Sequence, residues 1–447
     1  MMTVRTLTDE TADTADPVEH VLTYVLAYDD LASDLTRTVR LPITSGELVI
    51  GRAPEGAPFA LAGGVLQVPD RWMSGTHATL VLQNGRATLR DAGSRNGTYV
   101  DGERISTRAL RDGSLIELGH SIVCYRTVPA SRVAALEAAA ALRLGPTRTA
   151  CPEVAALLVD LSRIAPSTES VLVLGETGAG KEIVAETIHR ASGRSGKLVS
   201  LDCGAIPDSL FESTLFGHKR GAFTGAEEAR TGEIARAHGG TLFLDEVGNL
   251  TPAAQAKLLR ALETRQITPL GAADPISVDV RWVAATNREL FTDDSFRADL
   301  LRRLAGYVAR VPPLRARRED IGILTAHVFC ELGRAKAAIA SAAARTLFSS
   351  EFPGNIRELR SMLRSAALLA GDGPITAAHL PAIVAAPVSR EPSRPTETRK
   401  PSAAEIEQAL AAAGGNVVHA AHALGTSARQ LYRWMEKYEI AIDSYRR

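Results

Sequence analysis

The sequence predicts a multidomain protein in which an all-β sandwich comes first, an α/β domain with a helical extension follows, and a small all-α domain comes last. Residues 21–128 show strand-like alternation that turn dipeptides interrupt. In residues 150–313 short apolar runs alternate with helical stretches, and residues 314–385 and 402–447 show helical periodicity alone. A chain of 447 residues is too long for one hydrophobic core, so several domains are expected.

Composition limits the class of protein. There are 51 lysines and arginines and 51 aspartates and glutamates, so no overall charge draws the chain to nucleic acid or membranes, and any such binding must be local. The four cysteines lack paired spacing, which favours reduced thiols over disulfides or a zinc site. No apolar run is long enough to cross a bilayer, and residues 1–20, expected to be disordered, are unlike a secretory signal. We therefore expect a cytoplasmic protein without a membrane partner.

The first domain contains repeated signals for tight hairpins. Asn84 and Gly85 lie between two alternating apolar segments, and both residues tolerate the positive φ of a two-residue turn. The same signal recurs twice, at Asp101 with Gly102 and at Asp112 with Gly113. Short strands at this spacing predict an antiparallel sandwich. Residues 129–149 are alanine-rich and are predicted to form a helical linker, whereas residues 386–401 are rich in proline and charge and are predicted to form a flexible one.

A phosphate-binding loop follows the apolar residues 171–174, which predict a buried central strand. The backbone N–H groups of such a loop surround phosphates, its lysine reaches the terminal phosphates, and the next helix points its positive end at them. Glu182 stands where a general P-loop has the serine or threonine that holds magnesium. The candidate ATP-binding residues are Gly175, Glu176, Thr177, Gly178, Ala179, Gly180, Lys181 and Glu182.

Two further strand ends complete the predicted site. The apolar residues 241–244 end at Asp245, which would hold Mg²⁺, and at Glu246, which would polarise the attacking water. Residues 280–285 predict another strand that leads to Asn287, a candidate sensor of the γ-phosphate. A glycine loop alone could be a chance turn. The order of loop, acidic strand and polar strand end predicts a site for ATP and Mg²⁺ with Lys181 in a catalytic role.

These segments resemble the central AAA+ domain of the sigma-54-dependent bacterial enhancer-binding proteins. The resemblance runs almost continuously over residues 171–359 and includes Glu182, the usual residue of that family. Alone, two glycines around an apolar ring and a hydroxyl predict either an ordinary turn or a mobile loop that presents its tip to another protein. The resemblance implies a loop that contacts sigma-54, formed by Gly221, Ala222, Phe223, Thr224, Gly225 and Ala226.

The resemblance also assigns roles to three arginines. Residues 296–304 resemble the segment whose first and last arginines reach into a neighbouring subunit's site, which implies that Arg297 and Arg303 are catalytic fingers. Without the resemblance, this segment reads as an amphipathic helix with a solvated face. Residues 353–359 resemble the lid motif in which Arg357 contacts nucleotide. Fingers that act between subunits imply a hexamer or a similar closed ring, with a dimer at rest.

Three positions depart from the family pattern. Asp202 replaces an asparagine that links nucleotide state to the catalytic glutamate, and Asn249 replaces an acidic residue after the magnesium strand. Thr214 replaces a glutamate. These departures concern the coupling between hydrolysis and loop movement, and they leave the nucleotide-binding and loop-tip residues unchanged.

Three loop motifs of the first domain, at residues 51–52, 74–77 and 94–98, resemble those of forkhead-associated (FHA) domains, which are sandwiches that bind phosphothreonine peptides. A phosphate dianion suits an arginine fork beside a hydroxyl donor. His77 is expected to brace the loops, and Gly75 replaces a frequent arginine, so the alternative is an FHA fold without peptide binding. The implied phosphopeptide-binding residues are Arg52, Ser74, Arg95 and Asn96.

Three helices are predicted in residues 402–447. Ser427 and Gln430 have the spacing of a capping box for the last helix, and basic residues recur every four positions on one side of it. The segment resembles the Fis-type helix-turn-helix that ends many enhancer-binding proteins. A small helical dimerisation unit is the alternative. The candidate DNA-binding residues are Ser427, Arg429, Gln430, Arg433 and Lys437.

Together these features predict an ATP-hydrolysing transcriptional activator. It would bind enhancer DNA, remodel sigma-54 RNA polymerase and respond to a phosphothreonine-containing partner. One alternative is an AAA+ remodeller of another target that carries similar modules. The other is a non-enzymatic DNA-binding regulator that uses its ATP domain only to assemble.

Overall fold

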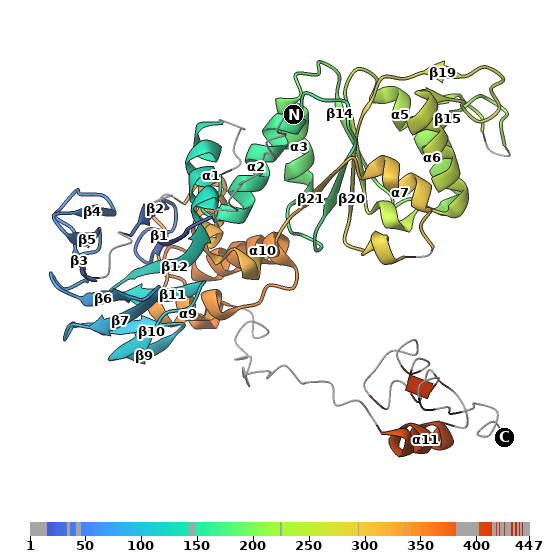
Figure 1. The fold of residues 1–447 in the computed structure, drawn as a ribbon. Helices are drawn as coiled ribbons and strands as arrows, with labels where there is room; N and C mark the ends of the chain where they lie inside the picture. Colours follow the sequence, from blue (N-terminus) through green and yellow to red (C-terminus); the bar gives the residue numbers. More distant parts are fainter. Residues whose placement is uncertain are drawn as a thin grey trace, which may run out of the picture. The chain divides into compact units, whose positions relative to one another are not determined.

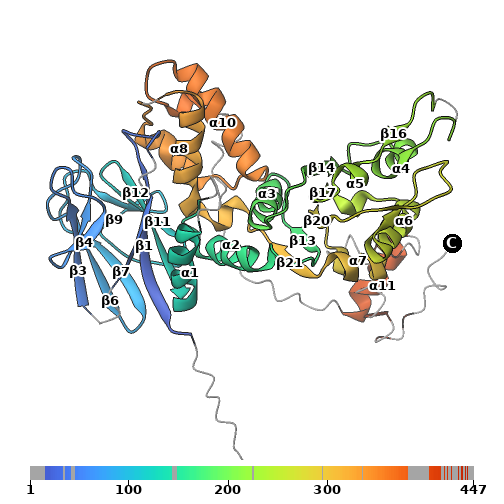
Figure 2. The same ribbon diagram turned by 90° about the horizontal axis from the view of Figure 1, so that it is seen from above.

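The computed structural model describes residues 16–33, 36–41, 46–142, 148–223, 226–293, 295–334, 336–380 and 402–413, together with single positions between 417 and 440. The chain forms two compact units, Met1–Ala386 and Pro387–Arg447, which are described separately. The first unit contains the β-sandwich, the α/β domain and a helical lid (Figures 1 and 2). Every helix in the described ranges is too short or too polar to span a lipid bilayer.

The N-terminal domain is a sandwich of two six-stranded sheets, as predicted. One sheet has the order β2-β1-β12-β11-β8-β9 and the other β10-β7-β6-β3-β5-β4, and a hydrophobic cluster fills the space between them. The alternation in the sequence places every second side chain in that cluster. The strands are β1 (Val18–Ala27), β2 (Arg37–Arg40), β3 (Gly46–Arg52), β4 (Ala60–Ala62), β5 (Val65–Val68), β6 (Ala78–Gln83), β7 (Arg86–Asp91), β8 (Thr98–Val100), β9 (Glu103–Ile105), β10 (Thr107–Ala109), β11 (Ser114–Leu118) and β12 (Ser121–Pro129).

The hairpin predicted at Asn84 and Gly85 is present. Gln83 pairs with Arg86, and the two residues between them have φ angles of 49° and 71°. Both angles lie in the left-handed region that this type of turn requires. The turn fixes the register of β6 and β7, so that Ala78, Leu80 and Leu82 of β6 face the core together with Ala87 and Leu89 of β7.

The α/β domain is built on a five-stranded parallel sheet with the order β14-β17-β20-β13-β21. One face packs on α2 and α3, and the other packs on α4 to α7 (Figure 1). The strands are β13 (Val171–Leu174), β14 (Leu198–Asp202), β17 (Thr241–Asp245), β20 (Arg281–Thr286) and β21 (Tyr307–Arg310). The helices are α2 (Pro152–Ile164), α3 (Lys181–Ala191), α4 (Asp208–Phe216), α5 (Glu233–Arg236), α6 (Pro252–Thr264) and α7 (Ala298–Leu304). The predicted helical linker contains α1 (Ala130–Ala141).

The lid is helical, as predicted, and it packs directly on the sandwich. Residues of α8 and α10 share one hydrophobic cluster with residues of β1, β11 and β12 (Figure 2). The cluster therefore joins two parts of the chain that are separated in sequence by the whole α/β domain. The lid elements are the short 3-10 helices η3 (Leu314–Ala316) and η4 (Arg318–Asp320), then α8 (Ile321–Glu331), α9 (Ser341–Ser349), α10 (Asn355–Ala370) and η5 (Ala377–His379).

The C-terminal unit begins with α11 (Ala403–Ala412), which matches the first predicted helix. Ser402 caps this helix, and Glu405 completes a capping box. Apolar residues from all three predicted helices form one small cluster, which includes Ile406, Leu431 and Trp434. The five candidate DNA-binding residues, Ser427, Arg429, Gln430, Arg433 and Lys437, lie outside the described residues.

Candidate nucleotide-binding site

The glycine-rich loop connects β13 to α3 and requires its glycines. Gly178 and Gly180 have φ angles of 75° and 101°, which side chains rarely permit. A Cβ atom on Gly178 would lie 2.3 Å from the carbonyl oxygen of Gly354 in the lid. The loop is therefore shaped by tight backbone turns and by close contact with the lid, and α3 begins directly after it at Lys181.

The structure brings the three predicted strand ends together around Lys181. The ammonium group of Lys181 lies 3.0 Å from Oε1 of Glu246 and donates to the carbonyl of Gly175. Oε2 of Glu246 accepts from the backbone N–H of Asn287 at 3.1 Å, and the Asn287 amide donates to Thr177 Oγ1 at 3.0 Å. P-loop, acidic strand and polar strand end thus form one hydrogen-bonded network.

Glu246 has a strained backbone, because its φ of 51° is unusual for a residue with a side chain. A strained residue of this kind lowers the stability of the fold by about 1–3 kcal/mol, and such residues are found most often at functional sites. The contacts to Lys181 and Asn287 over-determine the position of the side chain. The strained turn aims the carboxylate at the P-loop.

A pocket of about 720 Å³ opens beside this network, a size that suits a nucleotide. It lies between the P-loop and α10 of the lid, and it includes Arg357 as the sequence predicts. The sequence analysis missed Arg360 and Arg364, although their spacing from Arg357 places all three on one helix face. The lining residues are Thr177, Gly178, Gly180, Lys181, Glu182, Ile183, Asp202, Asp245, Glu246, Asn249, Asn287, Ile356, Arg357, Arg360, Ser361 and Arg364.

Asp245 fits the predicted magnesium role by its chemistry and position. Mg²⁺ prefers a few carboxylate oxygens completed by water and phosphate, and Asp245 lines the pocket beside Glu246. Burial raises the pKa of Asp245, while the charge of Lys181 opposes the shift. A carboxylate that is costly to leave without a counter-charge is suited to bind a cation.

The lid is tied to the P-loop by Glu176. This carboxylate accepts from Arg315 of η3, with one contact at 2.8 Å, and from Asn355 of α10 at 3.1 Å. These hydrogen bonds, that of Arg315 first, lower the pKa of Glu176 to about 2. Asn355 also donates to the carbonyl of Thr177. Glu176 therefore fastens the lid to the loop, a role that the sequence analysis did not assign.

The two predicted arginine fingers lie on the surface and do not line the pocket of their own chain. Arg297 precedes α7 and pairs with Asp299 at 2.7 Å. Arg303 is exposed at the other end of α7, 3.9 Å from Glu263. Both positions leave the guanidinium groups accessible to another molecule.

The six-residue loop rises from a short antiparallel ladder of β15 (Gly217–His218) and β16 (Arg230–Thr231). A second hairpin, β18 (Gln266–Ile267) with β19 (Ile276–Ser277), leads to Leu270, which exchanges backbone hydrogen bonds with this base. Phe223 is 40% exposed, and its ring meets the ring of His218 edge-on at 5.0 Å. Thr224 and Gly225 lie outside the described residues.

The predicted phosphopeptide loops gather at one end of the sandwich. Ser74 Oγ accepts from the backbone N–H of Arg95 at 3.2 Å, and the Asn96 amide donates to the carbonyl of Trp72 at 2.7 Å. His77 is buried and contacts the backbones of both loops, as expected for a brace, and burial lowers its pKa. Arg52 is exposed at the end of β3.

The sequence analysis missed Trp72, a neighbour of these loops. Its ring stacks on His120 at 4.5 Å and remains 43% exposed, and its indole N–H donates to Asp29. The sequence does show a tryptophan two positions before Ser74. Sequence alone does not tell whether such an aromatic residue is exposed beside the loops or buried in the core.

Comparison with known proteins identifies four domain families along the chain. Family models match an FHA domain at residues 48–119, a sigma-54 interaction domain at 148–309, an AAA+ ATPase lid domain at 315–397 and a Fis-family bacterial regulatory domain at 402–438.

Curated relatives and a solved structure each match about two thirds of the chain. The transcriptional regulatory protein ZraR of Escherichia coli is 42% identical over 290 residues, which are 63% of this chain and 66% of ZraR. The nitrogen fixation protein VnfA of Azotobacter vinelandii is 40% identical over 299 residues, 64% of this chain and 57% of VnfA. The chain thus spans slightly less than two thirds of these relatives. The crystal structure of NtrX from Brucella abortus in complex with ATP is 29% identical with a TM-score of 0.50, and the match covers 66% of this chain and 70% of NtrX.

Proposed function

We propose, on the premise that this chain belongs to the sigma-54-dependent transcriptional regulators, that it hydrolyses ATP to remodel sigma-54 RNA polymerase at promoters. Its FHA domain would bind a phosphothreonine-containing partner, and its Fis-type domain would bind upstream enhancer DNA. These partners would place the protein in the cytoplasm.

One observation carries the proposal. One hydrogen-bonded network at the edge of a nucleotide-sized pocket joins three separate segments of the chain, through Lys181, Glu246 and Asn287. The terminal phosphate of ATP carries more charge than a carboxylate, so it would compete for Lys181 and release Glu246. The freed Glu246 is then placed to accept a proton from the attacking water.

The remaining groups of the pocket would hold the nucleotide. Asp245 would bind Mg²⁺, which neutralises charge on the phosphates during transfer. Arg357 from the lid would contact the phosphates, because it lines the pocket from the side that faces the P-loop. Backbone N–H groups at the start of α3 would complete the cradle.

Arg297 and Arg303 support the proposal of a ring. In one chain they lie on the surface and outside the pocket, so they would reach a nucleotide only in a neighbouring subunit. A closed ring, hexameric or similar, with a dimer at rest, would give every site such a neighbour. Planar guanidinium groups suit the charge that develops on a transferring phosphoryl group.

The exposed loop would be the output of the cycle. Phe223 at its tip is partly exposed, and the loop base is held by two hairpins that link it to the α/β domain. Loss of the γ-phosphate would withdraw the loop from sigma-54, in the manner of other nucleotide-controlled loops.

The test is promoter opening with purified sigma-54 polymerase. Thr224→Ala should retain ATP turnover and lose promoter opening, because the loop contacts sigma-54 and takes no part in hydrolysis. Retained opening in this variant would overturn the loop assignment. A wild-type protein that turns over ATP but does not act on sigma-54 polymerase would favour a remodeller of another target. Absence of turnover, with Glu246→Gln as the control, would favour a non-enzymatic regulator.

A further inference from the structure

The FHA domain is fastened to the lid along a continuous interface. Tyr28 and Leu31 of the FHA domain exchange backbone hydrogen bonds of 2.8 Å with Ile339 and Ala337 of the lid. A Cβ atom on Gly322 in α8 would lie 1.7 Å from the Val25 carbonyl oxygen in β1. Close packing of this kind transmits displacements and does not absorb them.

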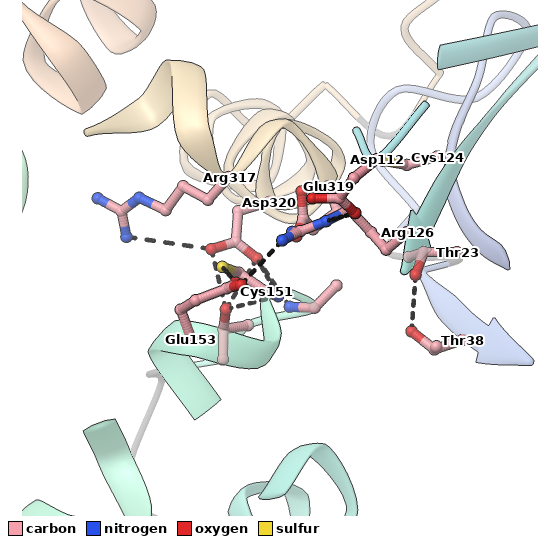
Figure 3. Close-up of polar contacts among 12 residues, drawn as sticks. Thr23, Thr38, Asp112, Cys124, Arg126, Cys151, Glu153, Arg317, Glu319 and Asp320 are labelled. Atoms are coloured by element: carbon pink, nitrogen blue, oxygen red, sulfur yellow. Dashed lines mark hydrogen bonds and ion pairs between the residues drawn. The ribbon is translucent and has the colours of Figure 1, made fainter. Parts of the chain in front are cut away.

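Arg126 of β12 lies at the centre of this interface and contacts three carboxylates (Figure 3). Its guanidinium pairs with Glu319 of η4, with Glu153 of α2 at 2.8 Å and with Asp112 at 2.9 Å. Arg126 is 6% exposed and Glu319 is 1% exposed. One FHA side chain therefore bridges the sandwich, the α/β domain and the lid.

Glu319 depends on Arg126 for its charge. Burial raises the pKa of Glu319 to about 7, while the charge of Arg126 opposes that shift. The ligand atoms of Cys151, Glu153 and Glu319 lie within 4.8 Å of one another, a spacing that could also hold a metal ion. The guanidinium of Arg126 already pairs with both of these carboxylates, and burial keeps the Cys151 thiol protonated by raising its pKa.

The turn that contains Glu319 continues to the P-loop. Asp320 accepts hydrogen bonds from the backbone N–H groups of Ala150 and Cys151, where α2 begins. Arg317 lies 4.0 Å from Asp320 and donates a hydrogen bond to the carbonyl of Ala179 in the P-loop. The same turn thus contacts a buried FHA arginine through Glu319 (Figure 3), and it contacts the phosphate-binding loop through Arg317.

We propose that Arg126 is a positioning residue for nucleotide binding, so that the FHA domain supplies part of the support of the ATP site. Arg126 holds Glu319 in place by their ion pair, and Glu319 belongs to the turn of residues 317–320. Arg317 of the same turn positions the Ala179 carbonyl by a hydrogen bond. The inference rests on the proposed ATPase function and names a route by which the FHA domain can regulate that site.

A second arginine at the same interface provides a matched control. Arg345 of α9 pairs with Glu117 of β11 at 2.7 and 2.9 Å and lies over the ring of Tyr99 at 4.0 Å. Glu117 is 5% exposed, so the loss of Arg345 also leaves a buried carboxylate. Among the residues that the structure describes, the hydrogen bonds and ion pairs of Arg345 go to Glu117 and do not reach the turn of residues 317–320 or the P-loop. The two arginines therefore differ in one respect: the partner of Arg126 lies in the turn that contacts the P-loop, and the partner of Arg345 does not.

The experiment measures the affinity of the full-length protein for a fluorescent ATP analogue with Mg²⁺, together with the KM and kcat of ATP turnover. At pH 8, Arg126→Met should weaken binding on the order of tenfold and raise KM with little change in kcat, because a displaced loop binds less well but the catalytic groups remain. Arg345→Met should retain wild-type affinity. Arg126→Met with Glu319→Gln should recover the part of the loss that comes from an unpaired buried charge and keep the part that comes from the missing anchor of the turn.

The pH dependence separates positioning from general loss of structure. The charged or titratable groups around Glu319 are Arg126 and Cys124 of β12, Asp112 before β11, Glu153 and Cys151 of α2 and its cap, and Asp320 of η4. Because the charge of Arg126 opposes the rise in the pKa of Glu319, removal of Arg126 raises that pKa further, so the defect of Arg126→Met should be smaller at pH 6 than at pH 8.5.

Equal weakening by Arg126→Met and Arg345→Met, or wild-type affinity in Arg126→Met, would overturn the inference and leave the proposed function intact. A wild-type protein that does not bind the nucleotide would overturn both. If Arg126→Met is not recovered folded, Arg126→Lys takes its place. Lysine keeps the charge but not the three contacts, so a smaller weakening is expected, and unchanged affinity would overturn the inference.

Discussion

Two cation–carboxylate pairs of the molecule differ in their surroundings. Lys181 and Glu246 line a pocket of about 720 Å³, whereas Arg126 and Glu319 are sealed between the FHA domain, α2 and the lid. The first pair can exchange partners when a ligand enters, because a phosphate group can replace the carboxylate. The second cannot exchange without separating domains. We therefore assign the Lys181–Glu246 pair to nucleotide binding and hydrolysis. We assign the Arg126–Glu319 pair to structural support of the site.

Glu246→Gln should have the largest effect and tests the exchangeable pair. The amide cannot accept a proton from water, so we expect ATP turnover to fall by about 10²–10⁴-fold. ATP binding should persist, because Lys181 loses a competing carboxylate. Turnover is measured by phosphate release and binding by a fluorescent nucleotide. Near-normal turnover in this variant would remove Glu246 from the catalytic role.

Arg126→Met should have the next largest effect and tests the sealed pair. Removal of one partner of a buried ion pair costs about 3–5 kcal/mol, so the free energy of unfolding should fall by that order in urea titrations. Asp112 is an exposed partner of Arg126, so Asp112→Asn, the control, should cost below about 1 kcal/mol. If the two variants lost similar free energies of unfolding, the Arg126–Glu319 pair would not behave as a buried ion pair.

The pH dependence of stability tests the same carboxylate without mutation. The folded-state pKa of Glu319, about 7, lies above the ordinary value of 4.5. The folded protein then binds more protons than the unfolded chain between these values, so the contribution of Glu319 to the free energy of unfolding should fall as the pH rises through that window. The fall should be about 1.4 kcal/mol per pH unit at most. Glu319→Gln should flatten this dependence, and an unchanged slope would contradict the assignment.

The smallest predicted effect concerns the fit between the FHA domain and the lid. Gly322→Ala adds one methyl group to a helix, which by itself favours helix formation. Because that methyl group would collide with the Val25 carbonyl, we expect a loss of about 1–3 kcal/mol in thermal or urea unfolding. Gly75→Ala, where a Cβ atom would have no neighbour within 4 Å, is the control. A stabilised Gly322→Ala variant would show that the interface is loose.

Much of the nucleotide site could be predicted from sequence, because its chemistry depends on local motifs. Each of its main motifs lies at the end of a strand, and parallel strands end at one edge of a sheet. These motifs are the segment from Gly175 to Lys181, the pair Asp245 and Glu246, and Asn287. The β-sandwich followed in the same way from turn dipeptides such as Asn84 with Gly85. Local patterns were sufficient for these elements.

The FHA–lid interface could not be predicted, because its residues carry no local signal. Arg126 lies within an alternating strand and Glu319 lies in a charged turn, 193 residues apart. Each reads as an ordinary surface charge until the fold buries both. Arg360 and Arg364 were missed for a related reason, since only the orientation of α10 shows that their face borders the pocket. Burial and domain packing are properties of the whole fold.

We propose that ATP hydrolysis in this pocket drives remodelling of sigma-54 polymerase. The most direct test of this proposal is opening of a sigma-54 promoter by the full-length protein, compared with ATP and with a non-hydrolysable ATP analogue. The account predicts open promoter with ATP and closed promoter with the analogue or with Glu246→Gln. Equal opening under all of these conditions, or no opening despite rapid ATP turnover, would contradict it.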